Sequence, residues 1–125
     1  FGGNPVALTA ALKTIELLEG GLVENSKNVG AYLEDGLNKL KDKYDCIGDV
    51  RGFGMMLGVE FVTDKASNTP APELRDKIEM ECFQKGLIIL GCGSNSIRWS
   101  PPLILSKENV DVALEIFDAA IAASI

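Results

Sequence analysis

The sequence contains no histidine among its 125 residues. This absence excludes mechanisms in which an imidazole moves the proton, and it removes the commonest ligand of protein zinc sites. Any catalysis by the chain alone would have to use carboxylates, lysine, cysteine or tyrosine, and we expect no metal site.

Cysteine is also scarce. The three cysteines are Cys46, Cys82 and Cys92, and none of them shows the Cys-x-x-Cys spacing. An odd number without that spacing is typical of free thiols in a reducing cytosol, so we expect a cytoplasmic protein. With no histidine to activate a thiol, the cysteines are expected to be core or surface residues rather than nucleophiles.

The sequence has fewer basic than acidic residues. There are 12 basic and 18 acidic residues, so the net charge is −6. This balance argues against nucleic acid or an anionic membrane as the main partner. The sequence has no apolar run near the roughly 18 residues of a membrane span and no secretory leader. It opens on Phe1 rather than Met, so we expect a piece of a longer polypeptide.

The apolar pattern predicts one domain over residues 1–125, of the α/β class and the α+β type. We expect a small, mostly antiparallel sheet with helices on one face. The predicted helices cover residues 5–18, 22–44, 72–85 and 107 onward, and the predicted strands cover 47–62, 87–90 and 97–100.

The first predicted strand alternates with a period of two. Met55, Leu57, Val59 and Phe61 should share one face, with Met56, Gly58, Glu60 and Val62 on the other. We expect a bend or bulge at Gly52 and Gly54, where the strand begins. The apolar run 87–90 is expected to be a buried strand that forms a hairpin with 97–100.

Three segments are candidates for a functional role. Gly2 and Gly3 precede a helix that Asn4 can cap, which suits either a phosphate or a plain capped helix. Arg98 alternates with apolar neighbours, so it should leave the sheet on the opposite face, where it could receive a carboxylate or form an ion pair. Arg51, beside a glycine turn, favours a structural ion pair.

Four segments together resemble class III aminotransferases. They are residues 1–7 (Phe-Gly-Gly-Asn-Pro-Val-Ala), 50–60 (Val-Arg-Gly-Phe-Gly-Met-Met-Leu-Gly-Val-Glu), 86–88 (Gly-Leu-Ile) and 96–104 (Ser-Ile-Arg-Trp-Ser-Pro-Pro-Leu-Ile). Within that family the chain is most similar to 4-aminobutyrate, ornithine and acetylornithine aminotransferases. The resemblance covers nearly the whole chain, in order.

The resemblance implies the C-terminal small domain of a fold-type I enzyme, with residues 1–21 as a helix leading from the large domain. It also implies a homodimer that uses pyridoxal phosphate. The reaction would pass an amino group from an ω-amino acid such as 4-aminobutyrate to a 2-oxo acid such as 2-oxoglutarate.

By the same resemblance, Arg98 matches the family arginine that meets a substrate carboxylate or an active-site glutamate. Gly2 and Gly3 match the segment near the cofactor phosphate of the partner subunit. The lysine that holds the cofactor would lie before Phe1, so we expect no catalytic residue in this chain and no activity from the chain alone.

Two other interpretations remain open. The chain could be a free-standing module that binds a small carboxylate through Arg98. It could also belong to a racemase or aminomutase, because one fold hosts several reactions of the same cofactor.

Overall fold

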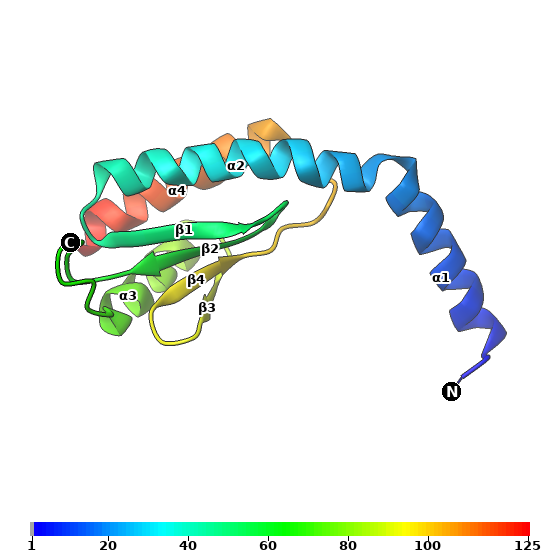
Figure 1. Cartoon of the computed structure of the whole chain (residues 1–125), viewed down its shortest axis with the longest axis horizontal. Coiled ribbons are helices and arrows are strands. Elements are labelled where there is room, and N and C mark those ends of the chain that lie inside the picture. The colour runs from blue at the N-terminus through cyan, green and yellow to red at the C-terminus, as the bar shows by residue number, and fades with distance from the viewer. Residues whose placement is uncertain (1) are drawn as a thin grey trace.

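Three helices cover one face of a four-stranded antiparallel sheet, and a fourth helix stands apart (Figure 1). The computed structural model describes residues 2–125, so Phe1 of the first motif lies outside the described residues. The α+β architecture expected from the sequence is confirmed. The elements in order are α1 (Pro5–Leu17), η1 (Leu18–Leu22), α2 (Val23–Lys43), β1 (Ile47–Phe53), β2 (Met56–Phe61), α3 (Pro72–Gln84), β3 (Leu90–Cys92), β4 (Ser96–Trp99) and α4 (Lys107–Ser124).

The single strand predicted over 47–62 is instead a hairpin of two strands, β1 and β2. Its turn needs glycine, because Gly54 has a φ of 57°, in the left-handed region that other residues rarely adopt. Gly30 of α2 lies directly against the backbone of Gly54, and a Cβ at Gly30 would collide with it. Of the two glycines expected at a bend, Gly54 therefore reverses the chain, whereas Gly52 stays within β1 and pairs with Leu57.

The sheet order is β1-β2-β4-β3, so two hairpins lie side by side and join along β2 and β4. The predicted hairpin of the last two strands is confirmed, but β3 begins only at Leu90. Ile88 and Leu90 are 76% and 54% exposed, so the run 87–90 is not the buried strand that we expected. The reason is that Leu90 pairs with Arg98 on the open face of the sheet and Ile88 precedes the strand, so only Ile89 of this run is buried in the core.

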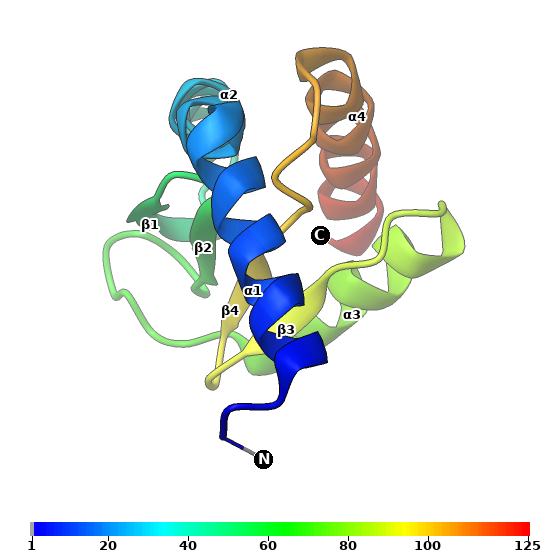
Figure 2. The ribbon, with the colours of Figure 1, turned by 90° about the vertical axis from the view of Figure 1, so that its right-hand side faces the viewer.

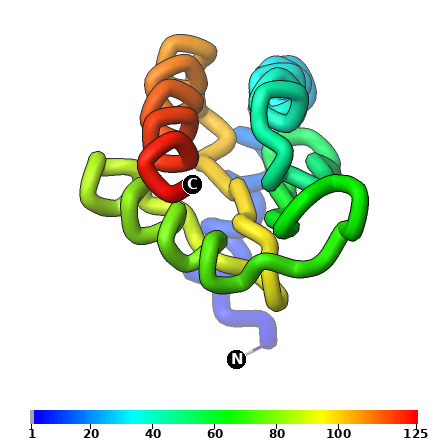
Figure 3. Tube along the Cα trace, turned by 90° about the vertical axis from the view of Figure 1, so that its left-hand side faces the viewer, coloured from blue at the N-terminus to red at the C-terminus, as the bar shows by residue number. Residues whose placement is uncertain are grey.

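The core lies between the sheet and the helices α2, α3 and α4 (Figure 3). Phe117 of α4 sits at its centre and packs edge-on against Phe61 of β2 and Trp99 of β4, with ring centroids 6.3 and 5.1 Å away. Each of these three helices buries apolar side chains here, including Leu33, Leu37, Ile78, Cys82, Val110 and Ile121. Strand residues at alternate positions complete the core, namely Leu57, Val59, Phe61, Ile97 and Trp99.

A polar contact joins α4 to the C-terminal end of α2. Asp118 of α4 accepts hydrogen bonds from Lys43 Nζ and Tyr44 Oη, both at 2.7 Å. Burial raises the pKa of the Asp118 carboxyl, but the bonds from Lys43 and Tyr44 outweigh it and leave that pKa below the ordinary value. The charged form of Asp118 therefore ties α4 to the end of α2.

Helix α1 is the exception to this packing. It has no buried residue and contacts no other helix or strand within residues 2–125 except η1. Figure 1 shows it apart from the sheet, which it overlaps only in the view of Figure 2. Gly21, with a φ of 132°, breaks the helical path in η1 and turns α1 away from α2. No helix of the described residues is long and apolar enough to cross a membrane.

Shortening Phe117 should test the central aromatic contact. Phe117→Ala should destabilise the domain by about 3–5 kcal/mol, because a large buried ring is lost and a cavity remains. The exposed Val112 of the same helix is the matched control, and Val112→Ala should change stability by less than about 0.5 kcal/mol. Urea unfolding measures both. If Phe117→Ala does not fold, Phe117→Leu should still show a clear loss, and equal midpoints for Phe117→Leu and wild type would contradict this packing.

Helix α1 should behave as a separate segment. Because its apolar side chains lack a partner, we expect fast amide exchange over Pro5–Leu17, repositioning of the helix, or association of two copies at high concentration. Deleting residues 1–17 should leave the urea midpoint of the remainder unchanged. Sedimentation that shows a monomer, together with strong exchange protection throughout Pro5–Leu17, would contradict this prediction.

Candidate functional site

The pairing of the strands places Arg98 in the middle of the open face of the sheet. Arg51 of β1, Gly58 of β2, Arg98 of β4 and Leu90 of β3 are successive partners across the four strands. Because neighbouring residues of a strand point to opposite faces, this row faces away from the core that holds Ile97. The predicted orientation of Arg98 is therefore confirmed.

The guanidinium of Arg98 has no hydrogen-bond or ion-pair partner among residues 2–125, and the residue is exposed. It lines a hollow of about 650 Å³ that Gly58 also lines. A Cβ added to Gly58 would meet only the Arg51 carbonyl oxygen, 3.8 Å away, so the space above this glycine is open. A planar fork of N–H donors beside open space can receive a carboxylate. Cys92 and Ser96 border the same hollow.

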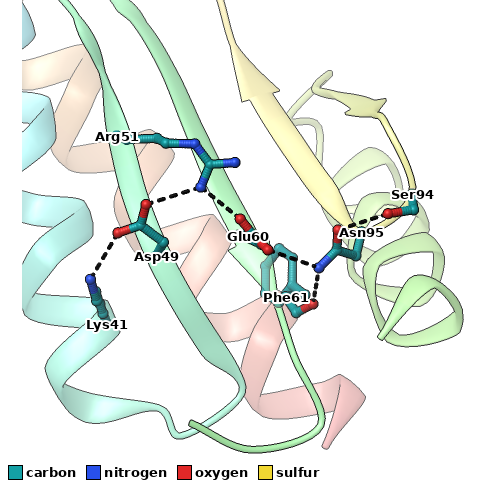
Figure 4. Close-up of polar contacts among 7 residues, drawn as sticks. All are labelled: Lys41, Asp49, Arg51, Glu60, Phe61, Ser94 and Asn95. Carbon is teal, nitrogen blue, oxygen red and sulfur yellow. Dashed lines mark hydrogen bonds and ion pairs between the residues drawn. The ribbon is translucent and has the colours of Figure 1, made fainter. Parts of the chain in front are cut away.

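Arg51 has a different environment on the same face (Figure 4). Its Nη1 atom lies 2.6 Å from Glu60 Oε2 and 3.0 Å from Asp49 Oδ2, and Lys41 Nζ lies 3.1 Å from Asp49 Oδ1. The hydrogen bond from Arg51 is the main cause that lowers the pKa of Asp49. The prediction of a structural ion pair at Arg51 is confirmed.

The glycines at the start of the chain lie far from this face. Gly2 and Gly3 are exposed and belong to the outer end of α1, opposite to its junction with α2 (Figure 1). Asn4 caps the helix, since its Oδ1 atom accepts from Val6 N at 2.9 Å and Ala7 N at 3.4 Å. Within this chain the structure does not bring Gly2 and Gly3 together with Arg98.

The thiols are placed as expected. Cys46 and Cys82 are buried, Cys92 is exposed, and all three are free. Burial raises the pKa of Cys46 and raises that of Cys82 to about 12, so neither thiol ionises readily.

Sequence reasoning did not identify Glu60 and Asn95 as part of the polar contacts on this side of the sheet. Asn95, in the turn between β3 and β4, is only 6% exposed. Its Nδ2 atom donates to Phe61 O at 2.7 Å and lies 3.4 Å from Glu60 Oε1. The alternation of residues 55–62 places Glu60 on the open face, but no local pattern indicates its partners.

Fold and site together define a small α+β domain that offers one unpaired arginine on an open sheet. The sequence pattern of the family described as Aminotransferase class-III matches residues 1–121. The chain belongs to the class III aminotransferase family.

Its relatives carry out several reactions. The chain is 43% identical to an alanine/serine racemase of Pyrococcus horikoshii (94% of this chain, 25% of the relative). It is 44% identical to the 4-aminobutyrate aminotransferase of Mycobacterium leprae (93% and 26%). It is also 40% identical to the human mitochondrial alanine–glyoxylate aminotransferase 2 (97% and 24%). The chain therefore spans about a quarter of the length of these relatives.

Solved structures agree on the fold. A Bacillus anthracis aminotransferase superposes with a TM-score of 0.93 at 32% identity, over 98% of this chain and 29% of that one. An amine transaminase from an uncultivated Pseudomonas species, solved in a form with bound pyridoxal phosphate, superposes with a TM-score of 0.91 at 31% identity, over 98% and 28%.

The residues of this chain do not by themselves fit the covalent attachment of pyridoxal phosphate. Every lysine is exposed except Lys41, which is partly buried and paired with Asp49. A lysine that holds the cofactor would need an enclosed site, and among residues 2–125 none has one. The group would have to be anchored by residues outside this chain.

Treatment of the chain with pyridoxal phosphate should therefore label no lysine selectively. After borohydride reduction and peptide mapping, we expect scattered, substoichiometric modification of exposed lysines such as Lys27 and Lys39. Stoichiometric labelling of one lysine would show that the chain holds a cofactor site of its own.

Proposed function

We propose that residues 1–125 form the small domain of a pyridoxal-phosphate-dependent aminotransferase and supply its carboxylate-binding arginine. The reaction would move an amino group from an ω-amino acid such as 4-aminobutyrate to a 2-oxo acid such as 2-oxoglutarate. The observation that carries the proposal is Arg98, unpaired on the open face beside the space over Gly58. The names of the relatives support transamination.

In this proposal Arg98 binds and orients the substrate and does no covalent chemistry. Its neighbours Ile97 and Trp99 are anchored in the core, so the backbone that carries the guanidinium is held firmly. Paired N–H donors fix both oxygens of a carboxylate and thereby set the direction of the rest of the molecule. The cofactor and its lysine would come from a large domain outside this chain.

We also propose the remaining partners. The exposed apolar surface of α1 is suited to contact with the large domain and with a second subunit. Gly2 and Gly3, at the outer end of that helix, would approach the cofactor phosphate of the second subunit. The free thiols favour a cytosolic location.

A racemase is the second candidate, and the 43% identity to an alanine/serine racemase is the observation that favours it. The two reactions differ in what they consume. A racemase inverts a single amino acid without any 2-oxo acid, whereas a transaminase needs an acceptor. Chiral analysis of products with and without 2-oxoglutarate separates them.

Replacing Arg98 should weaken carboxylate recognition without loss of folding. In the complete polypeptide, Arg98→Lys should reduce affinity for the carboxylate substrate about tenfold or more, because charge-assisted hydrogen bonds worth about 1.5–3 kcal/mol lose their bidentate geometry. Single-turnover kinetics on each half-reaction measures the effect, and circular dichroism checks the fold.

Lys27, an exposed residue of α2, is the matched control, and Lys27→Met should leave both half-reactions unchanged. If Arg98→Ala unfolds the domain, Arg98 is a structural residue and the assignment is wrong. If the variant folds and both half-reactions keep their wild-type rates and affinities, Arg98 takes no part in recognition. Carboxylate binding by the chain alone at full affinity would favour the free-standing module.

A further inference from the structure

Two arginines stand on either side of one glycine on the open face. Arg51 and Arg98 are both cross-strand partners of Gly58, from β1 and β4 respectively. Because adjacent strands are about 4.8 Å apart, their Cα atoms are separated by roughly 10 Å. Both residues line the hollow over Gly58, yet only Arg98 is unpaired there.

Glu60 lies where it could pair with either arginine. It follows Gly58 by two residues on β2 and faces the same side of the sheet, and its direct partners are Asp49 and Ser96. Arg51 and Arg98 are therefore both diagonal neighbours of Glu60. Diagonal positions of an antiparallel sheet are about 7–8 Å apart, which long side chains can span.

In the structure the two carboxylate oxygens of Glu60 have partners other than Arg98 (Figure 4). Oε2 lies 2.6 Å from Arg51 Nη1, and Oε1 lies 3.4 Å from Asn95 Nδ2. Asn95 is itself fixed, because its carbonyl oxygen accepts from Phe61 N at 2.8 Å and its side chain donates to Phe61 O.

The charges of the strands then fall into two groups. Lys41, Asp49, Arg51 and Glu60 form a continuous chain of ion pairs with no net charge. The strands β1 to β4 contain one further charged residue, Arg98, and it stays outside that chain. The positive charge that a carboxylate would meet on this face is therefore that of Arg98.

We propose that Arg51 is a positioning residue that determines specificity: it captures Glu60 and so keeps Arg98 available to a substrate carboxylate. This inference rests on the proposed role of Arg98. Without the charge of Arg51, the cation that remains on the strands is Arg98, which is a diagonal neighbour of Glu60. An internal carboxylate would then compete with the substrate for the same guanidinium.

A double-mutant comparison in the complete polypeptide tests this competition. The probe is glutarate, a dicarboxylate without a reactive carbonyl, and its affinity is measured by calorimetry at fixed ionic strength. Arg51→Met should weaken glutarate binding at least tenfold. Adding Glu60→Gln to that variant removes the competing charge and should restore the affinity to within about threefold of wild type.

Two further variants separate competition from a general loss of charge or structure. Lys41→Met removes one positive charge from the same ion-pair chain but leaves the Arg51–Glu60 pair, and it should bind glutarate like wild type. Arg51→Lys keeps a cation for Glu60 and should also retain affinity. Urea midpoints serve as the folding control, and Arg51→Gln replaces Arg51→Met if the latter does not fold.

The outcomes are distinct. If the double variant binds as weakly as Arg51→Met, or if Arg51→Met binds like wild type, Glu60 does not compete and the inference is wrong. In either case a loss of binding in Arg98→Met would leave the proposed function standing. If Arg98→Met binds glutarate like wild type, the proposed function is wrong and this inference fails with it.

Discussion

One-sided burial of the sheet is the constraint on which the rest of the structure depends. Helices α2, α3 and α4 cover one face, where Phe117 packs against Phe61 and Trp99. Each buried side chain of this size contributes roughly 2 kcal/mol, so the register that buries Leu57, Phe61 and Trp99 is strongly favoured. A slip by one residue would turn these side chains outward and bury Arg98 and Glu60 without partners.

The open face follows from the same alternation. The strand positions that do not serve the core carry the charged residues, and the cross-strand pairing decides which of them meet. Arg51 is satisfied by Glu60 and Asp49, whereas Arg98 is left unpaired beside a glycine. A sheet with a firm apolar underside can thus hold one guanidinium in a fixed place on an open surface.

A sheet with a buried apolar face and an open polar face is compatible with a family that carries out several reactions. The relatives of this chain include a racemase and aminotransferases, although the fold of the domain is shared. A domain that presents an arginine and contains no enclosed lysine among residues 2–125 can contribute recognition while the bond-making chemistry lies elsewhere. Helix α1 is exposed along its length, and no other described helix or strand except η1 contacts it.

Local patterns in the sequence were sufficient to predict the helices and the outward direction of Arg98. These features depend on spacings of two, three and four residues within one segment, which the amino-acid order records directly. The resemblance to the family also came from contiguous motifs. Only the tertiary structure decided that residues 47–62 fold back as β1 and β2, and that β2 lies beside β4. The partners of Arg51, Glu60 and Asn95 depend on that arrangement, because pairing between distant strands is selected by the packing of the whole core and by no spacing within a segment.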